Sequence, residues 1–160
     1  MIRPAQIQDI SQILQVIHNS IRSCIQDHQR HEPSIQQLLE SKTQHSLLMS
    51  MHYNDSWVYT IQERVVGFIM ISDQGEIIMN YVASEAQKQG IGAALMQNII
   101  ELIKPKKLGS ITIHSTHTAK DFYLKQGFKV TAQSTATISM HKTLKHEKQP
   151  YPDPTFSVLS

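Results

Sequence analysis

The stretch QKQGIGAAL, residues 87–95, places two glycines one residue apart at the start of an apolar segment. The preceding run EIIMNYV, residues 76–82, predicts a largely buried strand, and the following LMQNIIELI has the spacing of a helix. The glycines therefore lie in a strand-to-helix turn. Such a turn presents unpaired backbone N–H groups that a ligand can approach closely at glycine, which favours a phosphate site.

Spacing separates this turn from two common phosphate loops. A P-loop requires Lys and then Ser or Thr directly after the second glycine, but Ala93 and Ala94 follow Gly92. A dinucleotide-binding turn requires a small residue three positions after Gly92, where Leu95 stands. Both loops are disfavoured, and a glycine turn without any ligand is the plainer alternative.

The composition is typical of a single globular domain. The chain has 160 residues, 40% of them hydrophobic, and its longest apolar run, residues 65–71, is too short to span a membrane. The absence of a secretory signal and the single Cys24 favour the cytoplasm. A net charge of +2 does not indicate nucleic-acid binding, and the basic cluster at residues 104–107 is expected to be a solvated helix end.

The periodicities along the chain predict an α/β (α+β) fold. The expected order is a strand, two helices, three strands in an antiparallel meander, a helix, a strand, a short helix stopped by Gly127, and two closing strands. We expect a domain over residues 1–145. Residues 146–160 contain three prolines in a short segment and are expected to form an extended arm.

The order of these elements and two motifs resemble the GNAT superfamily of acyl-CoA-dependent N-acyltransferases, over residues 1–144. The phosphate signature of that family is Gln or Arg, two residues, Gly, one residue, and Gly or Ala; residues 87–92 match it in full. The second signature, A-x-x-x-Y followed by Gly-Phe, is matched by Ala119, Tyr123, Gly127 and Phe128. The resemblance implies the GNAT fold, a mixed and mostly antiparallel sheet flanked by about four helices.

The resemblance also implies a ligand for the glycine turn. The backbone of the turn would hold the pyrophosphate of coenzyme A, with acetyl-CoA as the acyl donor and no metal. The pantetheine arm would pair with the preceding strand like an added strand, and the next strand would diverge at residues 113–115. The expected contacts of the cofactor are Tyr81, Val82, Gln87, Lys88, Gln89, Gly90, Ile91, Gly92, Ala93, Thr116 and Ala119.

Thr116 departs from the pattern of the family, because many members have asparagine at this position. A threonine hydroxyl can donate one hydrogen bond but cannot reproduce an amide. The departure, together with the proline-containing arm, suggests the alternative function considered below.

Transfer of an acyl group from a thioester to an amine requires a base for the attacking ammonium and an acid for the departing thiolate. Tyr123, at the position of the family tyrosine, is the candidate acid because a phenol stays protonated at neutral pH. Glu76 stands 14 residues before Gly90, which resembles the spacing of the catalytic glutamate in histone-modifying members. It is the candidate base, and regular alternation would place it on the same face as Asn80. His114, on the adjacent strand, is the alternative base.

The histidine pairs His28 with His31 and His114 with His117 lack the partner ligands of a metal motif, so no metal is expected. The predicted function is an N-acetyltransferase that moves an acetyl group from acetyl-CoA to a primary amine by direct attack. The alternative is a catalytically weak, GNAT-like module that binds acyl-CoA or a partner protein. The acceptor, a small-molecule or peptide amine, carries no recognisable motif, and the closing strands with the arm could form a homodimer.

Overall fold

The structure is a computed structural model that describes residues 1–23, 32–135 and 137–144. The predicted arm at residues 146–160, the domain boundary at residue 145, Cys24 and the pair His28 and His31 lie outside the described residues. Within these three segments, no helix is both long and apolar enough to cross a membrane.

The three apolar runs of the predicted meander form the centre of the sheet. They are β2 (Asp55–Ile61), β3 (Arg64–Ile71) and β4 (Glu76–Val82), which pair antiparallel in chain order. The two residues between β2 and β3 both adopt positive φ, as a two-residue hairpin turn of type I′ requires. The meander predicted from the sequence is therefore confirmed.

The remaining strands extend this meander on both sides. β1 (Ile2–Pro4) lies against β2, and beyond β4 follow β5 (Ser110–Ser115), β7 (Ile138–Thr143) and β6 (Lys129–Gln133). The pair β4 and β5 is parallel, and the other pairs are antiparallel. The described strands thus form the mixed, mostly antiparallel sheet that was expected.

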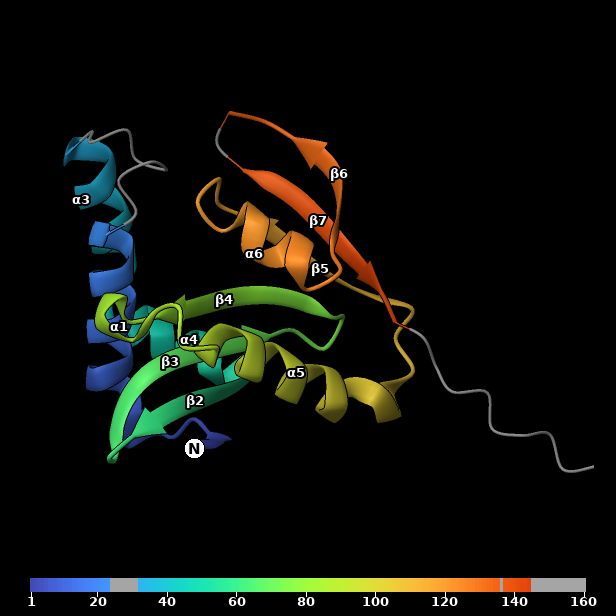
Figure 1. The fold of residues 1–160 in the computed structure, drawn as a ribbon. Helices are drawn as coiled ribbons and strands as arrows, with labels where there is room; N and C mark the ends of the chain where they lie inside the picture. The colour runs from blue at the N-terminus through green and yellow to red at the C-terminus, as the bar shows by residue number, and fades with distance from the viewer. Residues whose placement is uncertain (24–31, 136, 145–160) are drawn as a thin grey trace, which may run out of the picture.

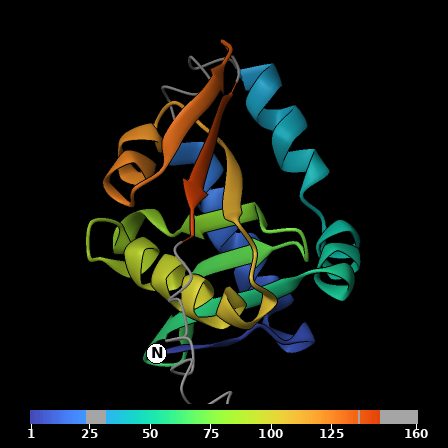
Figure 2. The ribbon, with the colours of Figure 1, turned by 90° about the vertical axis from the view of Figure 1, so that its right-hand side faces the viewer.

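Helices cover both faces of the central strands (Figures 1 and 2). α1 (Ile10–Ser23) packs on β3 and β4 from one face, and α5 (Ile91–Ile103) packs on β2, β3 and β4 from the other. α6 (Lys120–Lys125) precedes the closing β6–β7 hairpin, and a tight helical turn η1 (Ile7–Asp9) precedes α1. The other described elements are α3 (Glu32–Ser41), α4 (Gln44–Tyr53), η2 (Ser84–Ala86) and η3 (Lys104–Lys106).

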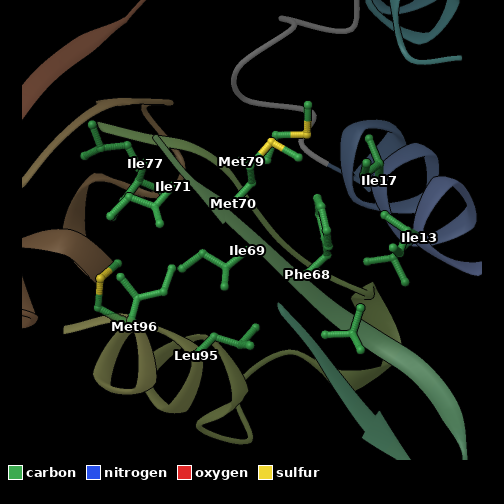
Figure 3. Packing of buried hydrophobic residues seen from close by; sticks show 14 of the residues in the cluster. Ile13, Ile17, Phe68, Ile69, Met70, Ile71, Ile77, Met79, Leu95 and Met96 are labelled. Carbon is green, nitrogen blue, oxygen red and sulfur yellow. The ribbon is translucent and has the colours of Figure 1, made fainter. Parts of the chain in front are cut away.

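The core is continuous across β3 because both faces of this strand are covered. Figure 3 shows Phe68 directed toward Ile13 of α1 and Ile69 directed toward Leu95 of α5. Phe68 and Ile69 have no exposed surface. A strand buried on both faces reads as an unbroken apolar run instead of an alternating one, which explains the run at residues 65–71.

One helix was not predicted. α4 has little segregation of apolar residues to one side, and Leu47 is its only buried residue, so it lacks the periodicity by which helices are recognised. A signal was nevertheless present at its start. The Thr43 side chain accepts a hydrogen bond from the Ser46 backbone N–H, and the Ser46 hydroxyl accepts one from the Thr43 N–H, as in a capping box. The described residues accordingly contain five α-helices.

Candidate active site

The parallel strands β4 and β5 separate soon after they begin. β4 pairs with β5 only at Glu76 and Ile77, whereas β5 pairs with β7 along its whole length. Figure 1 shows β4 diverging from the layer of β5, β6 and β7. Tyr81 and Val82 lie on the part of β4 that has no neighbouring strand on this side within the described chain. An extended ligand could therefore pair with this edge.

An extra residue interrupts β4 near the point of separation. The register with β3 includes Ile77 and Met79 but skips Ile78, which is exposed. Such a bulge breaks the alternation of side chains and often redirects them next to a functional site. The expectation that Glu76 and Asn80 share a face assumed regular alternation, so it does not follow from the observed register.

The glycine turn begins α5 with an open backbone. Gly90 is the N-terminal cap residue with φ of 79°, and Lys88 also has a positive φ of 62°. No side chain caps this helix, and a Cβ built on Gly90 would meet no atom within 4 Å. Uncapped N–H groups at the positive end of the helix dipole form a suitable site for a phosphate group.

The glycine turn, the end of β4 and α6 meet at Gly92. A Cβ built on Gly92 would lie 3.2 Å from Phe122 Cζ and 3.8 Å from Val82 Cγ2. Gln87 also contacts this junction, because its Nε2 donates to the Val82 carbonyl at 3.1 Å. The Gln87 side chain, predicted as a cofactor contact, thus has a partner within the protein that holds the turn against β4.

Tyr123 is buried on α6 at the same junction. Its hydroxyl accepts a hydrogen bond of 3.0 Å from Asn80 Nδ2, and its ring packs edge-on against Phe122 and Phe128. Burial raises the pKa of Tyr123 well above its ordinary value, and the hydrogen bond from Asn80 opposes this in part. The phenol is therefore protonated at neutral pH, as a general acid must be.

Asn80 was not among the predicted site residues. Its partner Tyr123 is 43 residues away in the sequence, so no local pattern links the two. The signal available was weaker: Asn80 is the polar residue in the apolar end of the strand that leads into the glycine turn.

The two candidate bases lie together at the paired start of β4. Glu76 Oε1 is 3.9 Å from His114 Nε2, and His114 Nδ1 is 3.1 Å from Ser139 Oγ. Both Glu76 and His114 are exposed. Glu76 is four residues from Asn80, roughly 13 Å along a strand, so the structure brings the two bases together but does not place either beside Tyr123.

Thr116 has a local partner at the start of α6. Its Oγ1 accepts a hydrogen bond of 3.2 Å from the backbone N–H of Ala119, the N-terminal cap residue of the helix. The hydroxyl oxygen therefore stabilises the turn into α6. Its hydrogen can still be donated to a ligand.

The described residues contain no group of three or more His, Cys, Asp or Glu side chains positioned to hold a metal ion. His114 and His117 have separate partners. His114 bonds to Ser139, and His117 Nε2 lies 3.0 Å from the Thr135 carbonyl oxygen.

Comparison with solved structures identifies proteins of the same fold. The PaiA N-acetyltransferase of Thermoplasma acidophilum, in complex with coenzyme A, superposes with a TM-score of 0.81 at 20% identity, covering 90% of this chain and 98% of that one. A GCN5-related N-acetyltransferase of Rhodopseudomonas palustris gives a TM-score of 0.82 at 18% identity, with 90% and 95% covered. The ribosomal-protein-S18-alanine N-acetyltransferase of Escherichia coli gives 0.70 at 13% identity, with 95% and 98% covered.

At these identities the likeness shows a shared fold. No curated protein matches the chain at the sequence level. None of the comparisons supports the alternative of a catalytically weak module. The model of the acetyltransferase (GNAT) domain matches residues 25–140, well over half of the chain, and the chain therefore belongs to the GNAT acetyltransferase family.

Proposed function

We propose that this chain transfers an acetyl group from acetyl-CoA to a primary amine. The observation that carries the proposal is the junction at which the open turn before α5, the end of β4 that has diverged from β5, and the buried acid Tyr123 meet. Gly92 lies against Phe122, and the next residue, Tyr123, is bonded to Asn80 of β4. The similar fold of the PaiA enzyme in complex with coenzyme A supports the same ligand class here.

The donor would be held mainly by backbone groups. The first-turn N–H groups of α5 would bind the diphosphate, and Lys88, which has no ion pair among the described residues, would add a positive charge. The amide groups of the pantetheine arm would pair with β4 at Tyr81 and Val82. Ala93 and Ala119, in the first turn of α5 and at the start of α6, have small side chains that leave room for the arm.

Acetyl transfer then breaks the thioester C–S bond and forms a C–N bond. The attacking ammonium loses one proton to a base before attack and a second as the amide forms. Tyr123 donates its proton to the departing sulfur and recovers one from the nitrogen, so one proton is released to solvent overall. Its high pKa keeps the proton available at neutral pH.

Glu76 is the proposed base. It lies at the closed end of the β4–β5 opening, and a carboxylate there can take a proton from the amine through water. His114 Nε2, 3.9 Å from Glu76 Oε1, can share this role in its neutral form. The distance along β4 between Glu76 and Asn80 means that a single atom of the acceptor cannot contact both the base and the acid directly.

The proposal is tested by incubating the purified chain with acetyl-CoA and a panel of amines. The panel contains monoamines, polyamines, amino acids, and peptides with a free N-terminus or lysine, because the acceptors of the GNAT neighbours include a ribosomal protein. Release of free thiol together with a product heavier by one acetyl group supports the proposal. Binding of acetyl-CoA without any acetylated product would contradict it.

A further inference from the structure

The hydrogen bond between β4 and Tyr123 has a defined direction. Asn80 Nδ2 donates to the Tyr123 hydroxyl at 3.0 Å, so the phenol oxygen accepts and its own hydrogen is left for another acceptor. No such acceptor is found among the described residues, and the Tyr123 ring is enclosed by Phe122 and Phe128. Among the described residues, the hydrogen bond from Asn80 holds the phenol oxygen and leaves the phenolic proton unused.

The other end of the same amide has an unusual environment. Asn80 Oδ1 is buried and has no hydrogen-bond donor within the described part of the chain. A buried carbonyl oxygen without a donor is costly, and such an atom calls for an explanation. The described residues contain two further buried polar atoms without a partner, Asn98 Nδ2 and His141 Nδ1, but Asn80 is the one of the three that is bonded to Tyr123. An apolar residue of similar size would avoid this cost but could not donate a bond to Tyr123.

We propose that Asn80 is a positioning residue that directs the proton of Tyr123 toward the departing sulfur of the acyl donor. This inference rests on the proposed function and deepens it. By occupying a lone pair of the phenol oxygen, the amide turns the O–H bond away from β4. It also stabilises the negative charge that develops on the oxygen as the proton leaves.

Tyr123 donates one proton and recovers one within the same reaction. As the C–S bond breaks, its electron pair goes to sulfur, and sulfur takes the Tyr123 proton to form the thiol. The phenolate, still bonded to the Asn80 amide N–H, then takes a proton from the newly formed amide nitrogen through water. Asn80 itself gains and loses nothing, which distinguishes it from the acid.

The pKa of the thiol of protein-bound coenzyme A depends on whether Tyr123 donates a hydrogen bond to the sulfur. This pKa can be measured without an acceptor amine and without turnover. A hydrogen bond donated by Tyr123 favours the thiolate and lowers that pKa. The thiolate is followed by its ultraviolet absorbance as the pH is raised. The matching titration with desulfo-coenzyme A is subtracted to remove the signal of the protein's tyrosines.

Asn80→Leu is the main variant because it is nearly isosteric and introduces no charge. We expect it to raise the pKa of the bound thiol by roughly 0.5 to 1 pH unit. Tyr123→Phe should raise it by at least as much, and Asn80→Leu should add nothing further in the Tyr123→Phe background. Asn98→Leu, the same change at a half-buried amide on α5, is the matched control and should leave the pKa unchanged.

The outcomes separate this inference from the proposed function. Failure of the parent protein to bind coenzyme A would overturn both, and an unchanged thiol pKa in Tyr123→Phe would overturn the role of Tyr123 as acid and with it that of Asn80. If Tyr123→Phe raises the pKa of the bound thiol but Asn80→Leu leaves it unchanged or lowers it, only the role of Asn80 is overturned. A lower value is the result expected if Tyr123 instead donated to Asn80. If Asn80→Leu does not fold, Asn80→Asp is compared in the parent and in the Tyr123→Phe variant, and equal effects in both would contradict the inference.

Discussion

The two ends of β4 differ in the number of strands beside them. At its start, Glu76 and Ile77 pair with β5, and the buried Ile77 also pairs with Ile71 of β3. At its end, Tyr81 and Val82 pair with β3, and within the described residues no strand lies beside them on the side of β5. Among the described strands, β4 therefore has a neighbour on both sides at its start, the closed end, and on one side at its finish, the open end.

The polar side chains at the two ends of β4 differ in how deeply they are buried. At the closed end, the polar side chains of Glu76 and His114 lie on the surface and contact each other. At the open end, Tyr123 is buried and bonded to the half-buried Asn80, in surroundings of lower dielectric where a hydrogen bond has more influence on proton transfer. Changes at the open end should therefore affect the proposed reaction more strongly than those at the closed end.

The largest effect is expected where the open end meets the glycine turn. Gly92→Trp should abolish measurable binding of acetyl-CoA, because even a Cβ at Gly92 approaches Phe122 to 3.2 Å and the indole would fill the turn. Isothermal titration calorimetry measures this. Gly109→Trp is the control, since a Cβ there meets no atom within 4 Å. Binding by Gly92→Trp equal to that of the control would show that the turn does not hold the donor.

Removal of the acid at the open end should be the next largest effect. Tyr123→Phe should lower kcat roughly 100- to 10,000-fold while the KM for acetyl-CoA changes little, since the ring and its packing remain. Steady-state thiol release with an amine that the parent acetylates gives both constants. Tyr59→Phe, on β2 away from the junction, should behave as the parent. Equal kcat in Tyr123→Phe and the parent would remove the phenol from the mechanism.

The free energy of unfolding should likewise fall more for a change beside the open end of β4 than for a change at its exposed bulge. Ile69→Ala, at a fully buried position of β3 opposite Asn80, should lower the free energy of unfolding by about 2–5 kcal/mol. Ile78→Ala, at the exposed bulge residue of β4, should change it by roughly 0.5 kcal/mol or less. Urea unfolding followed by circular dichroism compares the two. Similar losses in both variants would mean that Ile78 is part of the core.

The base at the closed end should matter less than the acid. Glu76→Gln should reduce kcat/KM roughly 100-fold, at the lower end for acid–base groups, because water and His114 can take over part of its role. Adding His114→Gln should lower it further. Glu101→Gln on the outer side of α5 serves as the control. A Glu76→Gln enzyme with parental kcat/KM would assign the base elsewhere.

The smallest effect is expected on stability at high pH. Because burial raises the pKa of Tyr123 in the folded state, the unfolded chain releases this proton more readily, and stability falls as the pH rises above about 10. Below that pH the contribution of Tyr123 is fully present. Denaturant midpoints of the parent between neutral and alkaline pH should fall more steeply than those of Tyr123→Phe. A Tyr53→Phe control, at an exposed tyrosine, should retain the slope of the parent.

Several features of the site could be predicted because their signals are local. The glycine turn at residues 87–92, the strand before it and the tyrosine of α6 each depend on patterns within about ten residues, and the structure has a strand, a turn and a helix at these positions. The roles assigned to Gln87 and Thr116 were less complete, because their partners Val82 and Ala119 are backbone groups that no pattern of side chains identifies. α4 was missed because it lacks an apolar stripe.

The sequence by itself indicated the family, the order of the elements apart from α4, and the position of the glycine turn before α5. These follow from residue spacing, since glycine, apolar periodicity and turn residues act on neighbouring backbone. Only the tertiary structure decided how far β5 follows β4, where the bulge at Ile78 falls, and that Asn80 meets Tyr123. The physical reason is that strand pairing and burial are set by segments far apart in the chain, whose contacts no local pattern encodes.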